Sequence, residues 1–458
     1  MPPFAQDLVY IASAVLFVWG LKRLGHPETA RSGNGLAALG MLLAAAVTLL
    51  DRGVVSWTVL LVALVAGTLV GTLLARSIRM TAMPQLVGTF NALGGGASAL
   101  LAAAELVASG PNGPSTGVGL AIALGILVGS VTVTGSVVAV GKLQGFMPSR
   151  PVTWPLQRSA SALLAVTLAG TAIALALLPE VGPLAPALAA GALLLGLALV
   201  LPIGGADMPV VISLLNAYSG LAASAAGFAI GNPLLVLAGA LVGAAGLILT
   251  HHMCRGMNRS LANVAFGAFG AGDGTPGPAE SDAPVRRTTA EEAALLLGYA
   301  SSVIIVPGYG LAAAQAQHEA RKLMDVLVDR GITVNFAIHP VAGRMPGHMN
   351  VLLAEADVPY DRLLDLEDAN ARMPRTDVVV VVGANDVVNP SARDPESTIA
   401  GMPILEVDRA ANTLVVKRSL SPGFAGIPNP LFHLESTLML LDDAGAALSA
   451  LAREVREL

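Results

Sequence analysis

Long apolar stretches broken by short polar connections fill the first 261 residues of the chain, and a different pattern follows them. A helix needs about 20 mostly apolar residues to cross the hydrocarbon of a membrane. The pattern predicts nine such helices, at about residues 8–24, 34–50, 54–75, 84–108, 117–140, 159–178, 184–203, 208–230 and 233–254. We therefore predict a helical membrane domain over residues 1–261.

Cationic residues in the connections support nine crossings, because Lys and Arg stay on the cytoplasmic side during insertion. The first, third and fifth connections and the segment after the ninth span hold Lys22, Arg23, Arg31, Arg76, Arg79, Lys142, Arg150, Arg158, Arg255 and Arg259. The second, fourth, sixth and eighth connections hold just one cationic residue, Arg52. This alternation predicts an N-terminus outside the cell (inner) membrane and a C-terminal domain in the cytoplasm.

The predicted spans contain neutral polar residues and no charge near their middles, which argues against a simple relay of carboxylates. Asn91, Ser136 and Asn216 either hydrogen-bond to neighbouring helices or line a hydrated path. Asp207 lies in a Gly-rich break between the seventh and eighth spans. It is either a solvated loop residue or a carboxylate that receives or passes a proton.

Composition agrees with a membrane domain and excludes other classes. Hydrophobic residues make up 54% of the chain and charged residues 12%. Residues 1–261 have a net charge of +5 and the remaining residues a net charge of −10, so the second half has no basic surface for nucleic acid. The single Cys254 can form no disulfide within the chain. With His251 and His252 it has no second cluster of ligands, and we predict no metal site.

The second half has the pattern of an α/β domain. Residues 262–287 are rich in Gly and Pro and predict a flexible linker. Residues 288–458 alternate apolar strands with helices, which predicts a Rossmann-like, doubly wound parallel sheet. The strand Ser302–Val306 leads into a G-x-G-x-x-A motif and a helix that runs to about Arg330; the motif residues are Gly308, Gly310 and Ala313. Glycines between a strand and a helix allow the backbone to approach a pyrophosphate.

Two features of this half favour NADP over NAD. The strand at residues 332–338 ends in His339, without the acidic residue that usually binds the ribose of NAD. The strand at residues 413–416 ends in Lys417, Arg418 and Ser419, which are suited to hold a phosphate. Between them, the apolar strand at residues 378–382 ends in Gly383, Ala384, Asn385 and Asp386, where ligands of parallel sheets bind.

These motifs resemble the beta subunit of proton-translocating NAD(P) transhydrogenase across essentially the whole chain. The matching segments are Gly308–Gly310, His339–Ala356, Gly383–Asp386, Lys417–Ser419 and, in the membrane half, Ile203–Val211. The resemblance implies a proton-conducting membrane bundle and a domain that binds NADP(H). It also implies a partner alpha subunit that holds NAD(H), without which the enzyme (of the Si-specific/Re-specific type) is inactive, and a dimer of alpha-beta units in membrane lipid.

The resemblance also implies the residues of the NADP site. The contacts come from Tyr309, Val341, Ala342, Gly343, Arg344, Met345, Pro346, Gly383, Ala384, Asn385, Asp386, Val387, Gly401 and Met402. Lys417, Arg418 and Ser419 hold the 2'-phosphate. The start of a lid loop and the last contacts are then Leu420, Ser421, Pro422, Gly423, Phe424, Asp443 and Ala444.

The chain departs from the family at two positions. Asn91 stands where some members carry a titratable His, and Asn cannot carry a proton by changing its own charge. We therefore expect water chained between Asn91, Ser136 and Asn216, or a side chain from the partner. Phe424 stands where other members have Tyr, so the lid loses one hydrogen bond there.

Coupling of hydride transfer to proton movement needs a link between the two domains. We expect protonation near Asp207 and Asn216 to change the docking of the soluble domain, so that the NADP site alternately opens for exchange and closes for hydride transfer. Asp386 is the candidate coupling carboxylate beside the nucleotide, or equally a structural cap.

Two other functions also fit a membrane domain with a nucleotide domain. An ion channel or transporter regulated by a cytoplasmic NADP-binding domain is the first, although the spans contain no TVGYG filter sequence. The second is a membrane-anchored NADP oxidoreductase that acts on a lipid or quinone. It would need another redox group, and one cysteine offers no iron–sulfur site.

Overall fold

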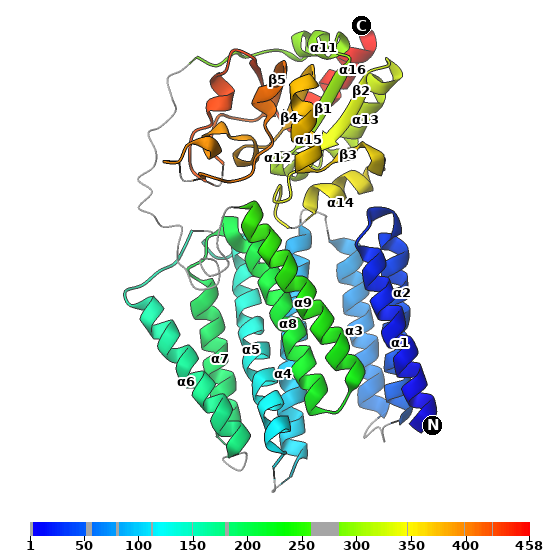
Figure 1. The fold of residues 1–458 in the computed structure, drawn as a ribbon, viewed down its shortest axis with the longest axis vertical. Coiled ribbons are helices and arrows are strands. Elements are labelled where there is room, and N and C mark those ends of the chain that lie inside the picture. The colour runs from blue at the N-terminus through cyan, green and yellow to red at the C-terminus, as the bar shows by residue number, and fades with distance from the viewer. Residues whose placement is uncertain are drawn as a thin grey trace. The chain divides into compact units, whose positions relative to one another are not determined.

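The computed structural model describes residues 3–51, 57–78, 82–110, 113–148, 150–178, 183–257, 284–345, 347–397, 399–423 and 425–458. Its contacts divide the chain into a unit of N-terminal helices and a unit built on a β-sheet (Figure 1). Most of the predicted linker, residues 262–287, lies outside the described residues. The domain boundaries that we place at residues 261 and 288 stay predictions.

Each of the nine predicted spans overlaps one helix in the described part of the chain. These helices are α1 (Pro3–Leu24), α2 (Pro27–Asp51), α3 (Trp57–Ser77), α4 (Met83–Ala108), α5 (Thr116–Gln144), α6 (Gln157–Leu177), α7 (Leu184–Val200), α8 (Met208–Ala229) and α9 (Pro233–Gly256). Seven of them, all but α1 and α7, are long and apolar enough to cross a membrane. α7 is a shorter apolar helix of 17 residues. The chain is therefore a multi-pass membrane protein.

Helix α5 contacts α4, α6, α7 and α8, and glycines let its backbone approach α4 closely. A Cβ at Gly95 of α4 would lie 2.8 Å from the carbonyl oxygen of Gly129 on α5. A Cβ at Gly220 of α8 would lie equally close, 2.8 Å, to the carbonyl oxygen of Gly239 on α9. Small residues at these crossings allow helices to pack tightly where no water drives their association.

The second unit contains a six-stranded parallel sheet in the order β3-β2-β1-β4-β5-β6. The strands are β1 (Ser302–Pro307), β2 (Thr333–Ala337), β3 (Leu363–Leu364), β4 (Val378–Val382), β5 (Asn412–Lys417) and β6 (Thr437–Leu441). This order is that of a doubly wound dinucleotide-binding fold, whose strand order reverses between β1 and β4. The predicted α/β class is confirmed.

Helices cover both faces of this sheet. Ile304 and Val306 of β1 pack in a buried cluster with Ala369 of α15 (Leu366–Arg372). Side chains alternate along a strand, so Val303 and Ile305 point to the opposite face, where they are also fully buried. The helices α11 (Ala290–Gly298), α13 (Gln317–Asp329) and α16 (Ala444–Glu457) pack together, with α13 on β2 and α16 on β5.

One predicted element is wrong in its extent. The helix after β1 does not run unbroken to residue 330 but is divided into α12 (Tyr309–Ala313) and α13. Gln315 lies between them with a φ of 52°, in the left-handed region that interrupts a right-handed helix.

Candidate functional site

The turns that follow β1 and β4 lie against each other at the carboxyl edge of the sheet. The Gly308 N–H donates to Val382 O at 2.8 Å, and the Gly310 N–H donates to Gly383 O at 2.9 Å. Gly383 has a φ of +63°, and a Cβ there would lie 2.8 Å from both the amide nitrogen and the carbonyl carbon of Gly310. Only glycine fits this close approach of the two turns. Ala313, the last residue of the predicted fingerprint, is exposed at the end of α12.

The side chains of Arg344 and His348 hold the loop after β2 at the carboxyl edge of the sheet. The Arg344 guanidinium lies over the Tyr309 ring, 4.3 Å from its centroid. His348, the first residue of α14 (His348–Glu355), accepts a hydrogen bond from the Arg344 N–H at 3.0 Å. Burial, followed by the charge of Arg344, lowers the pKa of His348 to about 4. Gly343 has a φ of +100°. Pro346 lies outside the described residues.

The turn after β4 and the predicted lid segment are joined by Asp386. Its Oδ2 accepts a hydrogen bond from the Ala425 N–H at 3.0 Å, and its carboxylate is in close contact with the backbone of Gly423. Asn385 contributes its carbonyl oxygen, which accepts from Asn429 Nδ2 at 3.2 Å. Phe424 lies outside the described residues, so its departure from the family stays a prediction.

Two cations and a hydroxyl follow β5, as predicted. Lys417 is half-buried; its ammonium donates to the Ser421 carbonyl and lies 5.0 Å from the centre of the Phe432 ring. Burial lowers the pKa of Lys417, and the negative charge of Asp386 opposes that shift. Arg418 and Ser419 are exposed, so they are open to an anionic ligand.

Four more predicted contacts lie in two further segments, Gly401–Met402 and Asp443–Ala444. Gly401, with a φ of +74°, donates to Ala392 O at 2.8 Å, and Met402 follows it. Asp443 caps α16, since its Oδ1 accepts from the Gly445 N–H at 3.0 Å. Ala444 is buried at the start of that helix. The structure thus places turns after β1, β2, β4, β5 and β6 at the ends of neighbouring parallel strands.

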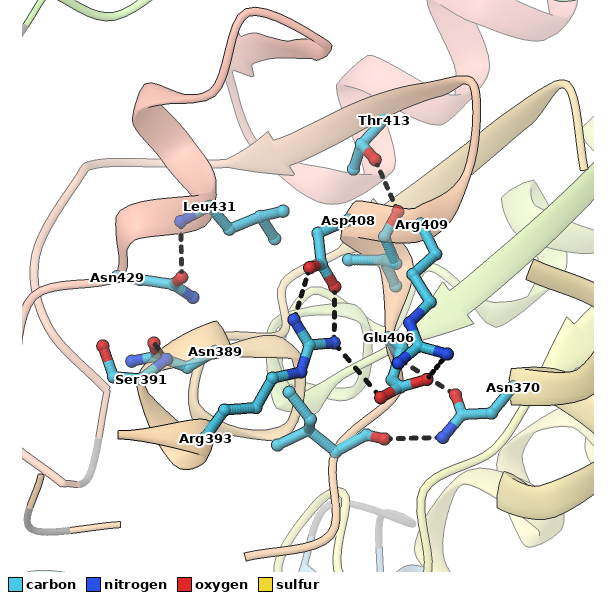
Figure 2. Close-up of polar contacts among 12 residues, drawn as sticks. Asn370, Asn389, Ser391, Arg393, Glu406, Asp408, Arg409, Thr413, Asn429 and Leu431 are labelled. Atoms are coloured by element: carbon cyan, nitrogen blue, oxygen red, sulfur yellow. Dashed lines mark hydrogen bonds and ion pairs between the residues drawn. The ribbon is translucent and has the colours of Figure 1, made fainter. Parts of the chain in front are cut away.

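A network of charged side chains braces the segment after Met402 (Figure 2). Arg393 makes two hydrogen bonds to the Asp408 carboxylate, at 2.6 and 3.0 Å, and an ion pair with Glu406 at 3.3 Å. Asn370 Nδ2 donates to Ile404 O at 2.9 Å, and Asn370 Oδ1 accepts from the Glu406 N–H at 2.9 Å. This segment is therefore fixed on both its backbone and its side chains.

In the membrane unit, three of the predicted proton-path residues lie close together. Asn91 Nδ2 donates to Ile212 O of α8 at 3.1 Å. Gly88 packs against Val140 and Gly95 against Thr132, and this antiparallel register of α4 and α5 sets Asn91 opposite Ser136. Asn216 lies one turn beyond Ile212. The buried Ser136 hydroxyl has no hydrogen-bond partner among the described residues.

Asp207 lies apart from these residues, in a 3-10 turn (Gly205–Asp207) directly before α8. The sequence analysis missed the residue that anchors this connection. Lys142, treated there only as a loop cation, is 2% exposed. Its ammonium donates to Leu201 O at 2.6 Å and to Ile203 O at 2.7 Å. Its place four residues after Val138, on the buried side of α5, is the signal that was available.

The fold and site together define a multi-pass membrane protein with a domain of the dinucleotide-binding fold. Residues 6–454 match the family described as NAD(P) transhydrogenase beta subunit. The chain is 48% identical over 460 residues to the NAD(P) transhydrogenase subunit beta of Rhodospirillum rubrum, which covers 95% of this chain and 96% of that protein. The same values hold for the subunit from a designated strain of that organism. The chain belongs to the NAD(P) transhydrogenase beta subunit family.

Proposed function

We propose that the chain is the NADP(H)-binding, proton-conducting beta subunit of a membrane transhydrogenase. A partner alpha subunit holds NAD(H), and hydride passes directly from NADH to NADP⁺ as protons cross the membrane. The single observation that carries the nucleotide site is the contact between Gly310 and Gly383. Glycines at both positions let the turns after β1 and β4 close on each other, and the backbone of such a G-x-G turn is where a pyrophosphate would bind.

The turn glycines and the cations among the described residues support NADP(H) as the ligand. The turn glycines Gly308, Gly310 and Gly383 face the pyrophosphate, and Arg344 stacks on Tyr309 at the same edge. Arg418 and Ser419 are exposed for the 2'-phosphate beside the half-buried Lys417. The other proposed contacts are Val341, Ala342, Met345, Ala384, Asn385, Val387, Gly401, Met402, Leu420, Ser421, Pro422, Asp443 and Ala444.

Hydride transfer requires no acid or base from the chain, because bound NADP(H) supplies the reacting nicotinamide ring. The residues bind and orient it and keep water out. Asp386 holds the segment around Ala425 through a hydrogen bond. We propose that proton uptake at this carboxylate weakens that hydrogen bond and releases the segment, which opens the site for exchange of NADP(H).

For the membrane unit we propose a proton path along α4, α5 and α8. Asn91, Ser136 and Asn216 hold a water chain, because none of them carries a proton by changing its charge. Asp207 passes the proton between this path and the cytoplasmic side. The cations of the odd-numbered connections support an N-terminus outside and an NADP domain in the cytoplasm, in a dimer of alpha-beta units.

The test is transfer of label between the nucleotides. The full chain, assembled with its alpha subunit in vesicles, is given NADP⁺ and NADH deuterated at the nicotinamide C4 position. Deuterium is expected in NADPH and not in water, and the prochiral position that carries it tests the Si-specific/Re-specific assignment. NADP binding without label transfer would contradict the proposal and favour a channel or transporter regulated by NADP.

A matched pair of variants locates the nucleotide. Lys417→Met is expected to weaken NADP⁺ binding, because it removes a cation at the proposed phosphate site. Lys322→Met is the control, since Lys322 is exposed on α13, where it pairs with Glu319 at 3.7 Å. Equal effects of the two substitutions would argue against this placement.

A further inference from the structure

His339 is a buried imidazole, 1% exposed, that immediately follows the edge of the sheet at β2. The residues after it, Val341 to Met345, are proposed to contact NADP(H). The sequence analysis noted His339 only because it stands where NAD-binding proteins usually have an acidic residue that binds the ribose. In the structure both ring nitrogens have partners, and the partners belong to different segments.

The two contacts fix which ring nitrogen carries the proton. Nε2 lies 2.7 Å from the carbonyl oxygen of Pro403, and a carbonyl can only accept, so Nε2 is the donor. Nδ1 accepts a hydrogen bond from the Val341 N–H at 3.3 Å, so it must be unprotonated. Burial lowers the pKa of His339 to about 4, which keeps the ring in this neutral form.

Pro403 belongs to a segment that the rest of the domain holds in place. Its neighbour Ile404 accepts from Asn370 at 2.9 Å, and the Leu405 N–H donates to Val387 O at 2.9 Å. Arg393 binds the side chains of Glu406 and Asp408 from the other side (Figure 2). The carbonyl that His339 binds is therefore a fixed point, connected through Val387 to the turn that carries Asp386.

We propose that His339 is a positioning residue for NADP(H). Its ring holds the loop at Val341–Met345 against the braced segment at Pro403, and so fixes the distance between the nucleotide contacts of these two segments. The inference rests on the proposed function, because it assumes that both segments contact NADP(H). Its chemistry is specific: one donor toward Pro403 and one acceptor toward Val341, at a separation that an imidazole provides.

The test uses the full chain assembled with its alpha subunit and three substitutions. His339→Phe keeps an aromatic ring, somewhat larger than the imidazole, and removes both hydrogen bonds. His339→Gln places an amide N–H near the Nε2 position, which reaches Pro403, whereas His339→Asn places an amide oxygen near the Nδ1 position, which reaches Val341 alone. His318→Gln is the matched control, because His318 is exposed on α13.

We expect His339→Phe to raise the KM for NADP(H) about tenfold or more, as loss of a buried hydrogen bond does, with the KM for NAD(H) unchanged. His339→Gln is expected to recover most of the loss, and His339→Asn less, because the link to Pro403 joins separate segments. A purely structural role would instead lower the amount of assembled enzyme in all three variants. Equal KM values in Gln, Asn and Phe variants, or a KM for NADP(H) like that of His318→Gln, would overturn the proposal.

Failure of the proposed function gives a different result from failure of this inference. Equilibrium binding of radiolabelled NADP⁺ is measured alongside deuterium transfer in the unmodified protein. If the unmodified protein binds NADP⁺ but transfers no deuterium, the transhydrogenase proposal fails, while the order of NADP⁺ affinities among the three variants still decides the role of His339. If transfer occurs and the affinities do not follow that order, only the role of His339 is refuted.

Discussion

Replacing Gly383 by Ala tests the contact on which the nucleotide site depends. The new Cβ would lie 2.8 Å from the amide nitrogen and carbonyl carbon of Gly310, and closer still to its Cα. These are backbone atoms on the turn after β1, so no side chain can rotate away. The turns after β1 and β4 must separate, although their strands are paired along Val303–Pro307 and Val378–Val382.

Two effects add in this variant. A residue other than glycine in the left-handed region costs about 1–2 kcal/mol, and Gly383 has a φ of +63°. Forcing an extra methyl group into a packed site costs about 1–3 kcal/mol more. Gly331→Ala is the control: Gly331 has a φ of +80° but no atom within 4 Å of its would-be Cβ. It therefore has only the first effect.

Hydrogen exchange followed by mass spectrometry is the suitable assay, because all three tryptophans, Trp19, Trp57 and Trp154, lie in the helical half and do not report on the sheet. Amides of β1 and β4 in Gly383→Ala are expected to exchange about 30-fold to 4,000-fold faster than in the unmodified protein, since each 1.4 kcal/mol is about tenfold. Gly331→Ala is expected to give about tenfold. Equal exchange in the two variants would refute the steric reasoning.

Three further predictions concern other residues. Lys142→Met removes the side-chain donor of the Ile203 carbonyl, whereas the Leu201 carbonyl keeps the Val152 N–H at 3.1 Å. The loss costs about 1–3 kcal/mol, so the unfolding temperature in detergent is expected to fall more than in the control Lys22→Met. Arg418→Gln is expected to weaken NADP⁺ binding about tenfold or more, as loss of a charged hydrogen bond does, and to leave NAD⁺ binding unchanged in equilibrium titrations; equal losses for both would contradict a 2'-phosphate contact. Because the pKa of His339 falls from 6.5 to about 4 on folding, its contribution to stability is complete above pH 6.5 and is lost as the pH falls toward 4. This loss amounts to about 3 kcal/mol at 1.36 kcal/mol per unit, and His339→Gln should flatten the pH dependence of hydrogen exchange between pH 7 and 4.5.

The sequence predicted well the features that have a period or a local signature. Long apolar runs located the helices, and the run at residues 378–382 located the central strand, because burial on both faces demands apolar residues at every position. The turn glycines were found because a strand, a G-x-G turn and a helix follow one another along the chain and form a local signature. The break at Gln315 was not, because a left-handed residue other than glycine leaves no signature.

The contacts between distant segments could not be predicted. His339 and Pro403 are 64 residues apart, and Lys142 and Leu201 are 59 apart. No local motif marks His339 as a buried donor, and the spacing of Lys142 from Val138 indicates burial but not which carbonyls Lys142 binds. Their roles follow from how the loops pack, which depends on the whole sheet and on the whole bundle.

The strand order has a consequence for how the domain that contains the sheet acquires its fold. The central strands β1 and β4 pair Val303 with Val378. The chain must therefore close the long loop between these residues, at a cost in entropy, before the contacts between β1 and β4 can form. A nascent chain therefore cannot complete the centre of the sheet until residue 382 has left the ribosome. Until then, Val303–Val306 has only the less central strands to pair with, and Val378–Val382 emerges as an unpaired apolar segment prone to association. Non-local pairing of this kind folds slowly, so a chaperone that covers these two segments should raise the yield of the assembled subunit.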